Sequence, residues 1–207
     1  VEASQSMIRV VGLSATLPNY KDVGAFLRVA PSGLFHFGPE FRRVAPVPLA
    51  MEFLGVSVTN MAARTNLMNE ICYNKVVDAL KRGKQVMVFV HSRKETGKTG
   101  RVLAEMAAKH GEEALFLGDD HPQYGMALKE VRKSRNRELA ELFDSGMGLH
   151  HAGMLRGDRS LTERLFSDGI IKVLCCTATL AWGVNLPAHT VVIKGTQSAP
   201  PEKNSGG

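Results

Sequence analysis

The chain has 207 residues, of which 44% are hydrophobic and 22% are charged, and its net charge is +6. These values are ordinary for a soluble globular protein and leave room for one α/β domain and part of a neighbour. No apolar run reaches about 18 residues and no signal-peptide pattern occurs, so neither a membrane span nor secretion is indicated. Three cysteines without a CxxC pair exclude a disulfide scaffold and a cysteine zinc site. The positive charge favours a polyanionic partner.

The first part of the chain predicts one short helix between two short strands. β-branched and aromatic residues predict strands at 8–13 and 34–37, and apolar side chains at helical spacing predict a helix over 21–29. Four prolines follow within a short stretch, as is typical of a connection rather than a core. We therefore expect a domain boundary near 44–48.

The rest of the chain alternates between predicted strands and predicted helices. Continuous apolar or β-branched runs predict strands at 49–58, 85–90, 114–117, 148–151, 170–176 and 190–195. Apolar residues at helical spacing predict helices at 61–82, 94–110, 128–143 and 158–166. Alternation of this kind is typical of an α/β fold in which a parallel sheet has helices on both faces.

One segment comes close to a phosphate-binding P-loop. Residues 92–99 follow an apolar strand and enter a helix, and Lys98 and Thr99 have the P-loop order. The P-loop pattern requires glycine six positions before the lysine, where this chain has Ser92. Without that glycine the loop is less free to turn its N–H groups around a phosphate. We therefore expect an ordinary helix start here.

Three segments place hydroxyl groups or glycine directly after predicted strands: Ser14 and Thr16, then Gly153, and finally Thr177 and Thr179. Hydroxyl and backbone N–H groups can hold phosphate oxygens because they carry no negative charge. The same hydroxyls also have a structural interpretation, since Ser and Thr commonly bond nearby backbone. Side chains alternate along a strand, so at most one of His150 and His151 faces a groove. The other is expected to be buried and hydrogen-bonded.

These segments resemble motifs of the superfamily-2 DExH helicases. Residues 13–19 (Leu-Ser-Ala-Thr-Leu-Pro-Asn), 148–154 (Gly-Leu-His-His-Ala-Gly-Met) and 173–189 follow the order of motif III, the HHAG element and motif V. Residues 88–93 are similar to motif IV of the second RecA-like domain. The resemblance is to the branch that contains the large spliceosomal RNA helicase and the helicase subunit of the activating signal cointegrator complex.

The resemblance implies an ATP-dependent RNA helicase built from RecA-like domains. It implies that Ser14 and Thr16 couple the nucleotide site to domain movement, and that Gly183 and Asn185 face the ATP. The residues implied to lie along nucleic acid are Ser92, Arg93, His150, Gly153, Thr177 and Thr179. The resemblance implies ATP and Mg²⁺ as cofactors of the full-length protein, with no metal ligand in this chain. Its implied partners are single-stranded or duplex RNA, with DNA as the alternative, the other helicase domains and a multiprotein complex, in an intracellular, nuclear location.

Missing motifs predict that the chain is a piece of a longer helicase. A Walker A loop, an Asp-Glu-x-His box and an arginine-bearing motif VI do not occur. By resemblance, residues 1–45 end the first RecA-like domain, 46–197 form an incomplete second one, and 198–207 form a hairpin tip. ATP hydrolysis needs the phosphate cradle, magnesium site and arginine finger together, so this piece alone is expected to be inactive. Two alternatives remain: a stand-alone nucleic-acid-binding module, or a small nucleotide-transferring P-loop enzyme that uses Lys98.

Overall fold

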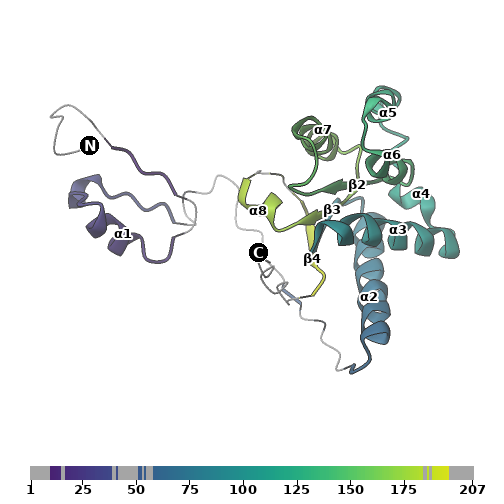
Figure 1. Ribbon diagram of the computed structural model, residues 1–207, viewed down its shortest axis with the longest axis horizontal. Coiled ribbons are helices and arrows are strands. Elements are labelled where there is room, and N and C mark those ends of the chain that lie inside the picture. Colours follow the sequence, from purple (N-terminus) through teal and green to yellow (C-terminus); the bar gives the residue numbers. More distant parts are fainter. Residues whose placement is uncertain are drawn as a thin grey trace, which may run out of the picture. The chain divides into compact units, whose positions relative to one another are not determined.

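The computed structural model describes residues 10–14, 17–38, 41, 51–52, 54, 58–183, 186 and 188–195. The chain divides into two compact units, residues 1–53 and 54–207, which are both drawn in Figure 1. The predicted boundary at 44–48 and the predicted hairpin tip at 198–207 lie outside the described residues. The assignment of the smaller unit to the end of a RecA-like domain stays a prediction.

The described residues of the smaller unit contain one α-helix, α1 (Tyr20–Phe26), followed by the short 3-10 turn η1 (Pro31–Gly33). The helix confirms the one predicted at 21–29, although it is shorter. The ring of Tyr20 stacks on that of His36, with their centroids 4.4 Å apart. This contact joins the start of α1 to the segment after η1.

The strands predicted in the smaller unit are wrong for the residues that the structure describes. Residues 10–13 and 34–37 belong to no strand, and Leu13 and Phe35 are exposed. A strand is stable only when a neighbour satisfies its backbone groups, and β-branched or aromatic content alone does not supply that neighbour. The strand predicted at 49–58 lies partly outside the described residues, and its described positions also belong to no strand.

The described residues of the larger unit are organised around a parallel four-stranded sheet with the order β2-β3-β1-β4. Its strands are β1 (Val86–Val90), β2 (Met147–His150), β3 (Val173–Thr177) and β4 (Thr190–Ile193). Every neighbouring pair is parallel, and Val86 lies opposite both Val173 and Thr190. All four strands overlap predicted ones. The predicted α/β, RecA-like parallel sheet is therefore confirmed.

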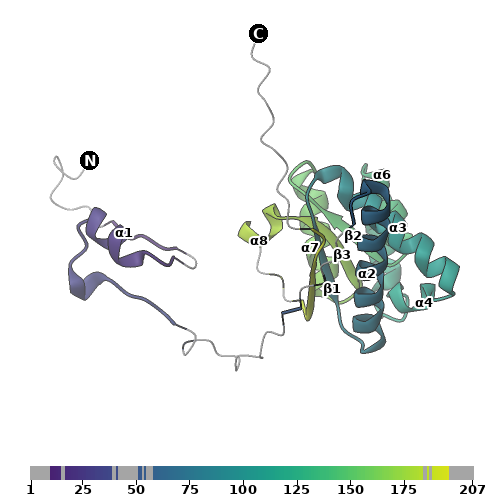
Figure 2. The same cartoon turned by 90° about the horizontal axis from the view of Figure 1, so that it is seen from below.

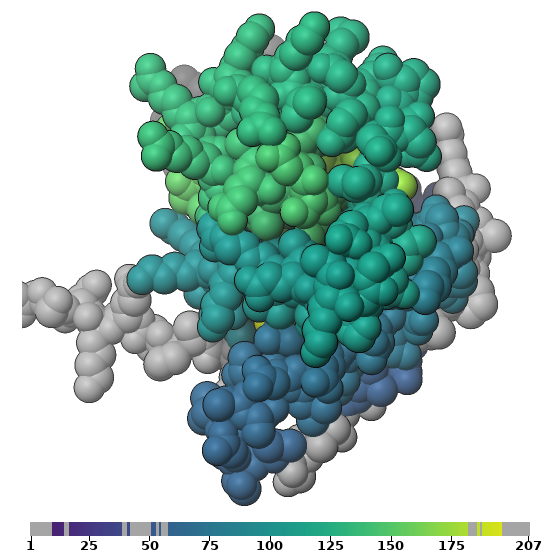
Figure 3. All heavy atoms as spheres, turned by 90° about the vertical axis from the view of Figure 1, so that its right-hand side faces the viewer, coloured from purple at the N-terminus to yellow at the C-terminus, as the bar shows by residue number. Residues whose placement is uncertain are grey.

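The described helices of this unit are α2 (Met61–Lys81), α3 (Arg93–His110), α4 (Glu113–Phe116), α5 (Tyr124–Lys133), α6 (Arg137–Asp144), α7 (Arg156–Ser167) and α8 (Thr179–Gly183). Figure 3 shows α2 in blue, α3 and α4 in teal and α5, α6 and α7 in green as adjacent bands of the surface. Side chains of Asn60, Ser92 and Asn136 cap α2, α3 and α6 by accepting hydrogen bonds from first-turn N–H groups.

Helices cover both faces of the sheet, as predicted. On one face, a Cβ on Gly148 would contact Thr162 of α7, and the His150 ring is bonded to Glu163 of the same helix. On the other face, Lys194, which follows β4, extends to Thr99 of α3. Side chains alternate between faces along each strand, so α7 lies on one side and α3 on the opposite side. Figure 2 shows α2 and α3 together beside the strands.

Two predicted elements of this unit are wrong. Residues 114–117, predicted as a strand, fall largely in helix α4, where Phe116 is buried. The single helix predicted at 128–143 is two helices, α5 and α6, separated at Ser134. The Ser134 hydroxyl donates to Asp158 of α7 at 2.7 Å and accepts from the Asn136 N–H at 2.9 Å. These bonds replace helical ones and favour the break.

The centre of the core is β3, which is buried along its whole length. Cys175 and Cys176 are fully buried free cysteines that point to opposite faces. Burial raises the pKa of Cys176 to about 12, so this thiol is neutral and serves as packing. None of the helices in the described parts of the chain is both long and apolar enough to cross a membrane.

Candidate nucleic-acid interface

The parallel sheet brings most of the sequence-predicted contact residues to one edge. Ser92 and Arg93 follow β1, Gly153 follows β2, and Thr177 ends β3 just before Thr179. Strands that run parallel have their carboxyl ends at the same edge, and ligands of open α/β sheets bind outside that edge. The order β2-β3-β1 places these residues on three adjacent strands. We call this set the carboxyl-edge group.

Arg93 and Gly153 are in direct proximity, although 60 residues separate them in the sequence. A Cβ on Gly153 would lie 3.2 Å from the Cδ and Nη1 atoms of Arg93, so the glycine lets the loop lie beside the guanidinium without a tight contact. The Gly153 N–H donates to Nδ1 of His151 at 3.1 Å, which fixes the turn. Arg93 itself is exposed at the start of α3. Its guanidinium is therefore available to an anion.

Thr177 and Thr179 form a pair of hydroxyls at the end of β3. Their Oγ1 atoms lie 3.3 Å apart, and either can donate to the other. Thr177 is only 9% exposed, whereas Thr179 is exposed in the first turn of α8. A hydroxyl pair of this kind can donate to and accept from oxygen atoms without adding charge.

Of the two adjacent histidines, His150 is the buried one. It is 3% exposed, its Nε2 lies 2.7 Å from Glu163 Oε1, and its Nδ1 has no hydrogen-bond partner among the described residues. The prediction that one histidine is buried and hydrogen-bonded is confirmed. The prediction assigned His150 to the groove, but the imidazole points to α7. A contact between His150 and nucleic acid stays a prediction. The buried position of the His150 ring against α7 does not favour such a contact.

His151 is the more accessible histidine of the pair. Burial lowers its pKa, nearby Arg93 and His150 lower it further, and Glu138 opposes them. The ring is therefore neutral at physiological pH. Because its Nδ1 accepts the Gly153 N–H, the proton of the neutral ring lies on Nε2. Sequence reasoning did not select this residue, because alternation alone cannot show which histidine faces α7.

The structure does not test the remaining predicted residues. Ser14 is exposed in the smaller unit, and Thr16 and Asn185 lie outside the described residues. Gly183 is the last residue of α8. Their predicted roles in coupling and nucleotide binding stay predictions.

The segment similar to a P-loop forms no phosphate cradle. α3 begins at Arg93, and the Ser92 hydroxyl caps it by accepting from the Glu95 N–H at 3.3 Å. Lys98 therefore lies within the helix and pairs with Glu95 at 3.3 Å. A P-loop needs its N–H groups free in a loop before the lysine. The expectation of an ordinary helix start is confirmed, and these residues do not fit the ATP phosphates.

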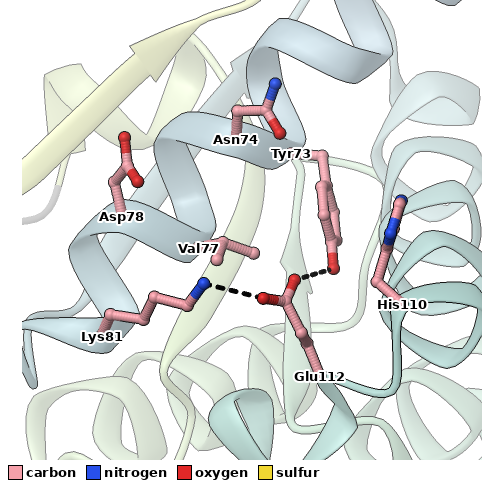
Figure 4. Close-up of a pocket in the computed structure, with 7 residues that line it drawn as sticks. All are labelled: Tyr73, Asn74, Val77, Asp78, Lys81, His110 and Glu112. Atoms are coloured by element: carbon pink, nitrogen blue, oxygen red, sulfur yellow. Dashed lines mark hydrogen bonds and ion pairs between the residues drawn. The ribbon is translucent and has the colours of Figure 1, made fainter.

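A hollow of about 360 Å³ lies near the ends of α2 and α3, away from the carboxyl edge (Figure 4). Within it, Glu112 accepts from the Tyr73 hydroxyl at 2.6 Å and pairs with Lys81 at 2.8 Å. The Tyr73 ring stacks on His110, with centroids 5.5 Å apart. These groups satisfy one another and join α2 to the end of α3. The cluster is therefore a structural one.

Replacing Glu112 with glutamine should make stability less dependent on pH. The ion pair with Lys81, and then the Tyr73 hydroxyl, hold the pKa of Glu112 below its ordinary value of 4.5. The ionised carboxylate thus stabilises the fold at neutral pH, and this contribution is lost as pH falls through the lowered pKa. Urea unfolding should show Glu112→Gln less stable than wild type at pH 7, with the gap closing below pH 4.5. Glu105→Gln, at an exposed site on α3, is the control; an equal gap at both pH values would contradict this.

Comparison with known proteins identifies what the chain is similar to. No protein-family model matches it. It is 60% identical over 198 residues to the DExH-box ATP-dependent RNA helicase DExH14 of Arabidopsis thaliana. It is 59% identical to activating signal cointegrator 1 complex subunit 3 of Mus musculus and 55% identical to that of Homo sapiens, each over 198 residues. Each match covers 95% of this chain but 9% of the relative, so the chain spans about one-tenth of their length. The chain is therefore homologous to one segment of the DExH-box ATP-dependent RNA helicase DExH14 and of activating signal cointegrator 1 complex subunit 3.

Proposed function

We propose that the chain forms an incomplete second RecA-like domain, with the end of the first, of an ATP-dependent RNA helicase. In this role its carboxyl edge holds the backbone of one RNA strand. The observation that supports this most directly is the proximity of Arg93 to Gly153 at the edge where Thr177 ends β3. A guanidinium, a backbone approached closely and a hydroxyl are suited to phosphate oxygens. Binding is therefore expected to depend little on base sequence.

The residues of the carboxyl-edge group contribute different chemical groups to the proposed RNA contact. Arg93 supplies the positive charge, and Thr177 and Thr179 supply hydroxyls that donate without repelling a phosphate. The neutral ring of His151 adds a further N–H donor on Nε2. Phosphate contacts of this kind fix the register of the strand, and they allow it to advance when the two RecA-like domains move.

The proposed use of ATP is based on the name of a relative, and not on a nucleotide site among the described residues. The Arabidopsis relative is named an ATP-dependent RNA helicase. Residues 92–99 form no phosphate cradle, so we assign binding of the ATP phosphates and Mg²⁺ to other parts of the helicase. Gly183 and Asn185 are the proposed contribution of this chain to the nucleotide site, with Ser14 and Thr16 coupling that site to domain movement. When bound, ATP supplies the free energy of the movement.

A multiprotein assembly is also part of the proposal. The mouse and human relatives are named subunits of the activating signal cointegrator 1 complex. We propose that the helicase containing this chain works within a complex of this type, in the nucleus. Co-purification of the full-length protein from nuclear extract, with its partners identified by mass spectrometry, tests this assignment.

The RNA-binding role predicts that Arg93→Ala weakens binding and reduces its salt dependence. The chain should bind a fluorescent single-stranded RNA weakly, and with similar affinity for different sequences. Loss of one phosphate contact should make the negative slope of log K against log salt shallower by about 0.7 and should lower the affinity by roughly threefold to tenfold. Fluorescence anisotropy over a range of salt concentrations measures both quantities.

The matched control is Arg82→Ala. Arg82 follows α2 at the opposite edge of the sheet, just before β1, and its side chain donates only to the Asp78 carbonyl among the described residues. Its removal should leave the slope unchanged. Equal losses for Arg82→Ala and Arg93→Ala would show that general charge, and not the carboxyl edge, binds RNA. Failure of the wild-type chain to bind RNA would refute the proposal.

A further inference from the structure

Lys194, the residue directly after β4, is a buried lysine. It is 9% exposed, and its Nζ donates to the Thr99 hydroxyl at 3.1 Å. An ammonium group has three donors, and this is the one acceptor found for it among the described residues. Within the same residues, no carboxylate lies within ion-pair distance of Nζ. The positive charge is therefore poorly compensated.

The two cysteine thiols near this ammonium do not supply a negative charge. Cys72 of α2 is buried, and burial raises the pKa of its thiol to about 11, with Lys194 opposing the rise. Burial also raises the pKa of Cys175, again against the effect of Lys194. Both thiols are therefore neutral at physiological pH. A buried charge with neutral neighbours costs free energy unless a counter-ion reaches it.

A hollow of about 180 Å³ adjoins Lys194 at the carboxyl ends of β1 and β4. Lys98 and His91 also line it, and its one described acid, Glu95, pairs with Lys98 at 3.3 Å. Gly195 supports one wall: its φ is +86°, and a Cβ there would lie 2.6 Å from His91 Nε2. The backbone can approach His91 this closely only because the residue is glycine. The hollow thus has an excess of positive charge and a defined wall.

We propose that this hollow is an additional phosphate subsite, in which Lys194 and Lys98 hold one phosphate of the RNA backbone. The inference rests on the proposed RNA-binding function and extends it to β4. RNA is favoured over a protein carboxylate because the hollow lies at the same edge as the carboxyl-edge group, and His91 immediately precedes Ser92 and Arg93. The subsite would extend the contacts with the bound RNA strand from the carboxyl end of β1 to that of β4.

The test is Lys194→Met in the 207-residue chain, measured by RNA anisotropy over a range of salt concentrations. Methionine keeps the length of the side chain and removes the charge. The negative slope of log K against log salt should become shallower by about 0.7, as for one phosphate contact, and RNA affinity should fall severalfold. The variant should melt no lower than wild type, because an uncompensated buried charge has been replaced by an apolar group.

Two controls separate charge from packing. Thr99→Val removes the hydroxyl partner of Lys194 and keeps the ammonium, so its slope should equal that of wild type. Lys84→Met removes an exposed lysine just before β1, at the opposite edge of the sheet, and should also leave the slope unchanged. A loss of slope in Thr99→Val would show that Lys194 acts through packing and would overturn the subsite.

A second measurement uses inorganic phosphate as the probe. Phosphate should raise the melting temperature of wild type above that in chloride of equal ionic strength, and should not do so for Lys194→Met. If wild type binds RNA and Lys194→Met keeps its slope, the subsite is refuted while the proposed function stands. If wild type binds no RNA but phosphate still protects it through Lys194, both the RNA assignment and the proposed function fail. Protection by oligoglutamate and not by phosphate would instead identify a protein carboxylate and overturn the proposal.

Discussion

Gly146→Ala is expected to lower the unfolding free energy of the larger unit by about 3 kcal/mol or more. Gly146 has a φ of +75°, which side chains other than glycine rarely adopt. A Cβ there would also overlap the carbonyl group of Phe116 and lie 2.8 Å from the Leu117 nitrogen. Backbone on both sides must move, and β2 begins at the next residue. Urea unfolding followed by circular dichroism measures the loss.

Gly83→Ala separates the two causes of this effect. Gly83 has a φ of +67°, but a Cβ there would meet nothing within 4 Å. Its replacement should therefore cost only the conformational term, about 1–2 kcal/mol. If Gly146→Ala lowered the unfolding free energy by no more than Gly83→Ala, the close approach of the Phe116 carbonyl to Gly146 would be disproved. Gly146→Ala should also weaken RNA binding, because a shift of β2 would displace Gly153, which follows the same strand.

The long regular elements of the larger unit could be predicted from the sequence because their patterns are local. The helix predicted at 61–82 ends within a residue of α2, and Gly83 follows with the left-handed conformation expected of a helix stop. The continuous apolar run at 170–176 is typical of a strand buried on both faces, and β3 is buried throughout. In these segments, composition and burial point to the same structure.

Tertiary contacts decided the elements that the sequence did not predict. The break between α5 and α6 depends on the Ser134 hydroxyl meeting Asp158, 24 residues away. Four apolar-rich residues at 114–117 suit a strand or a helix equally, and Phe116 packs into the core from a helix. No local pattern contains these contacts. For the same reason, the predicted strands of the smaller unit are absent from its described residues.

The candidate site was predicted in its positions but not in its orientations. Strand ends placed Arg93, Gly153 and Thr177 at one edge, because parallel strands carry their carboxyl ends together. The direction of the His150 ring depends on Glu163 of α7, which strand alternation cannot reveal. In the sequence, Lys194 is one lysine after an apolar strand, and no local pattern predicts that it is buried. Its burial becomes visible only when α3 places Thr99 beside it.

Thr177→Val in the full-length helicase is expected to lower RNA-stimulated ATPase activity more than basal activity. Valine is nearly isosteric with threonine and suits a strand end, so β3 should keep its position. Loss of one hydroxyl contact costs about 0.5–1.5 kcal/mol, and about 1.5–3 kcal/mol when the acceptor is a charged phosphate oxygen. Stimulation at subsaturating RNA should therefore fall by roughly threefold to a hundredfold, while basal activity changes less. Steady-state ATPase assays over an RNA titration measure both.

Thr190→Val provides the matched control for Thr177→Val. Thr190 begins β4 at the opposite edge of the sheet, and its hydroxyl bonds His189 at 2.9 Å. It has the same chemistry as Thr177 but lies away from the proposed RNA path, so its replacement should leave RNA stimulation unchanged. Unaltered RNA affinity and stimulation in a folded Thr177→Val protein would remove Thr177 from the interface. In that case its buried hydroxyl would serve only to bond Thr179 and hold the start of α8 against β3.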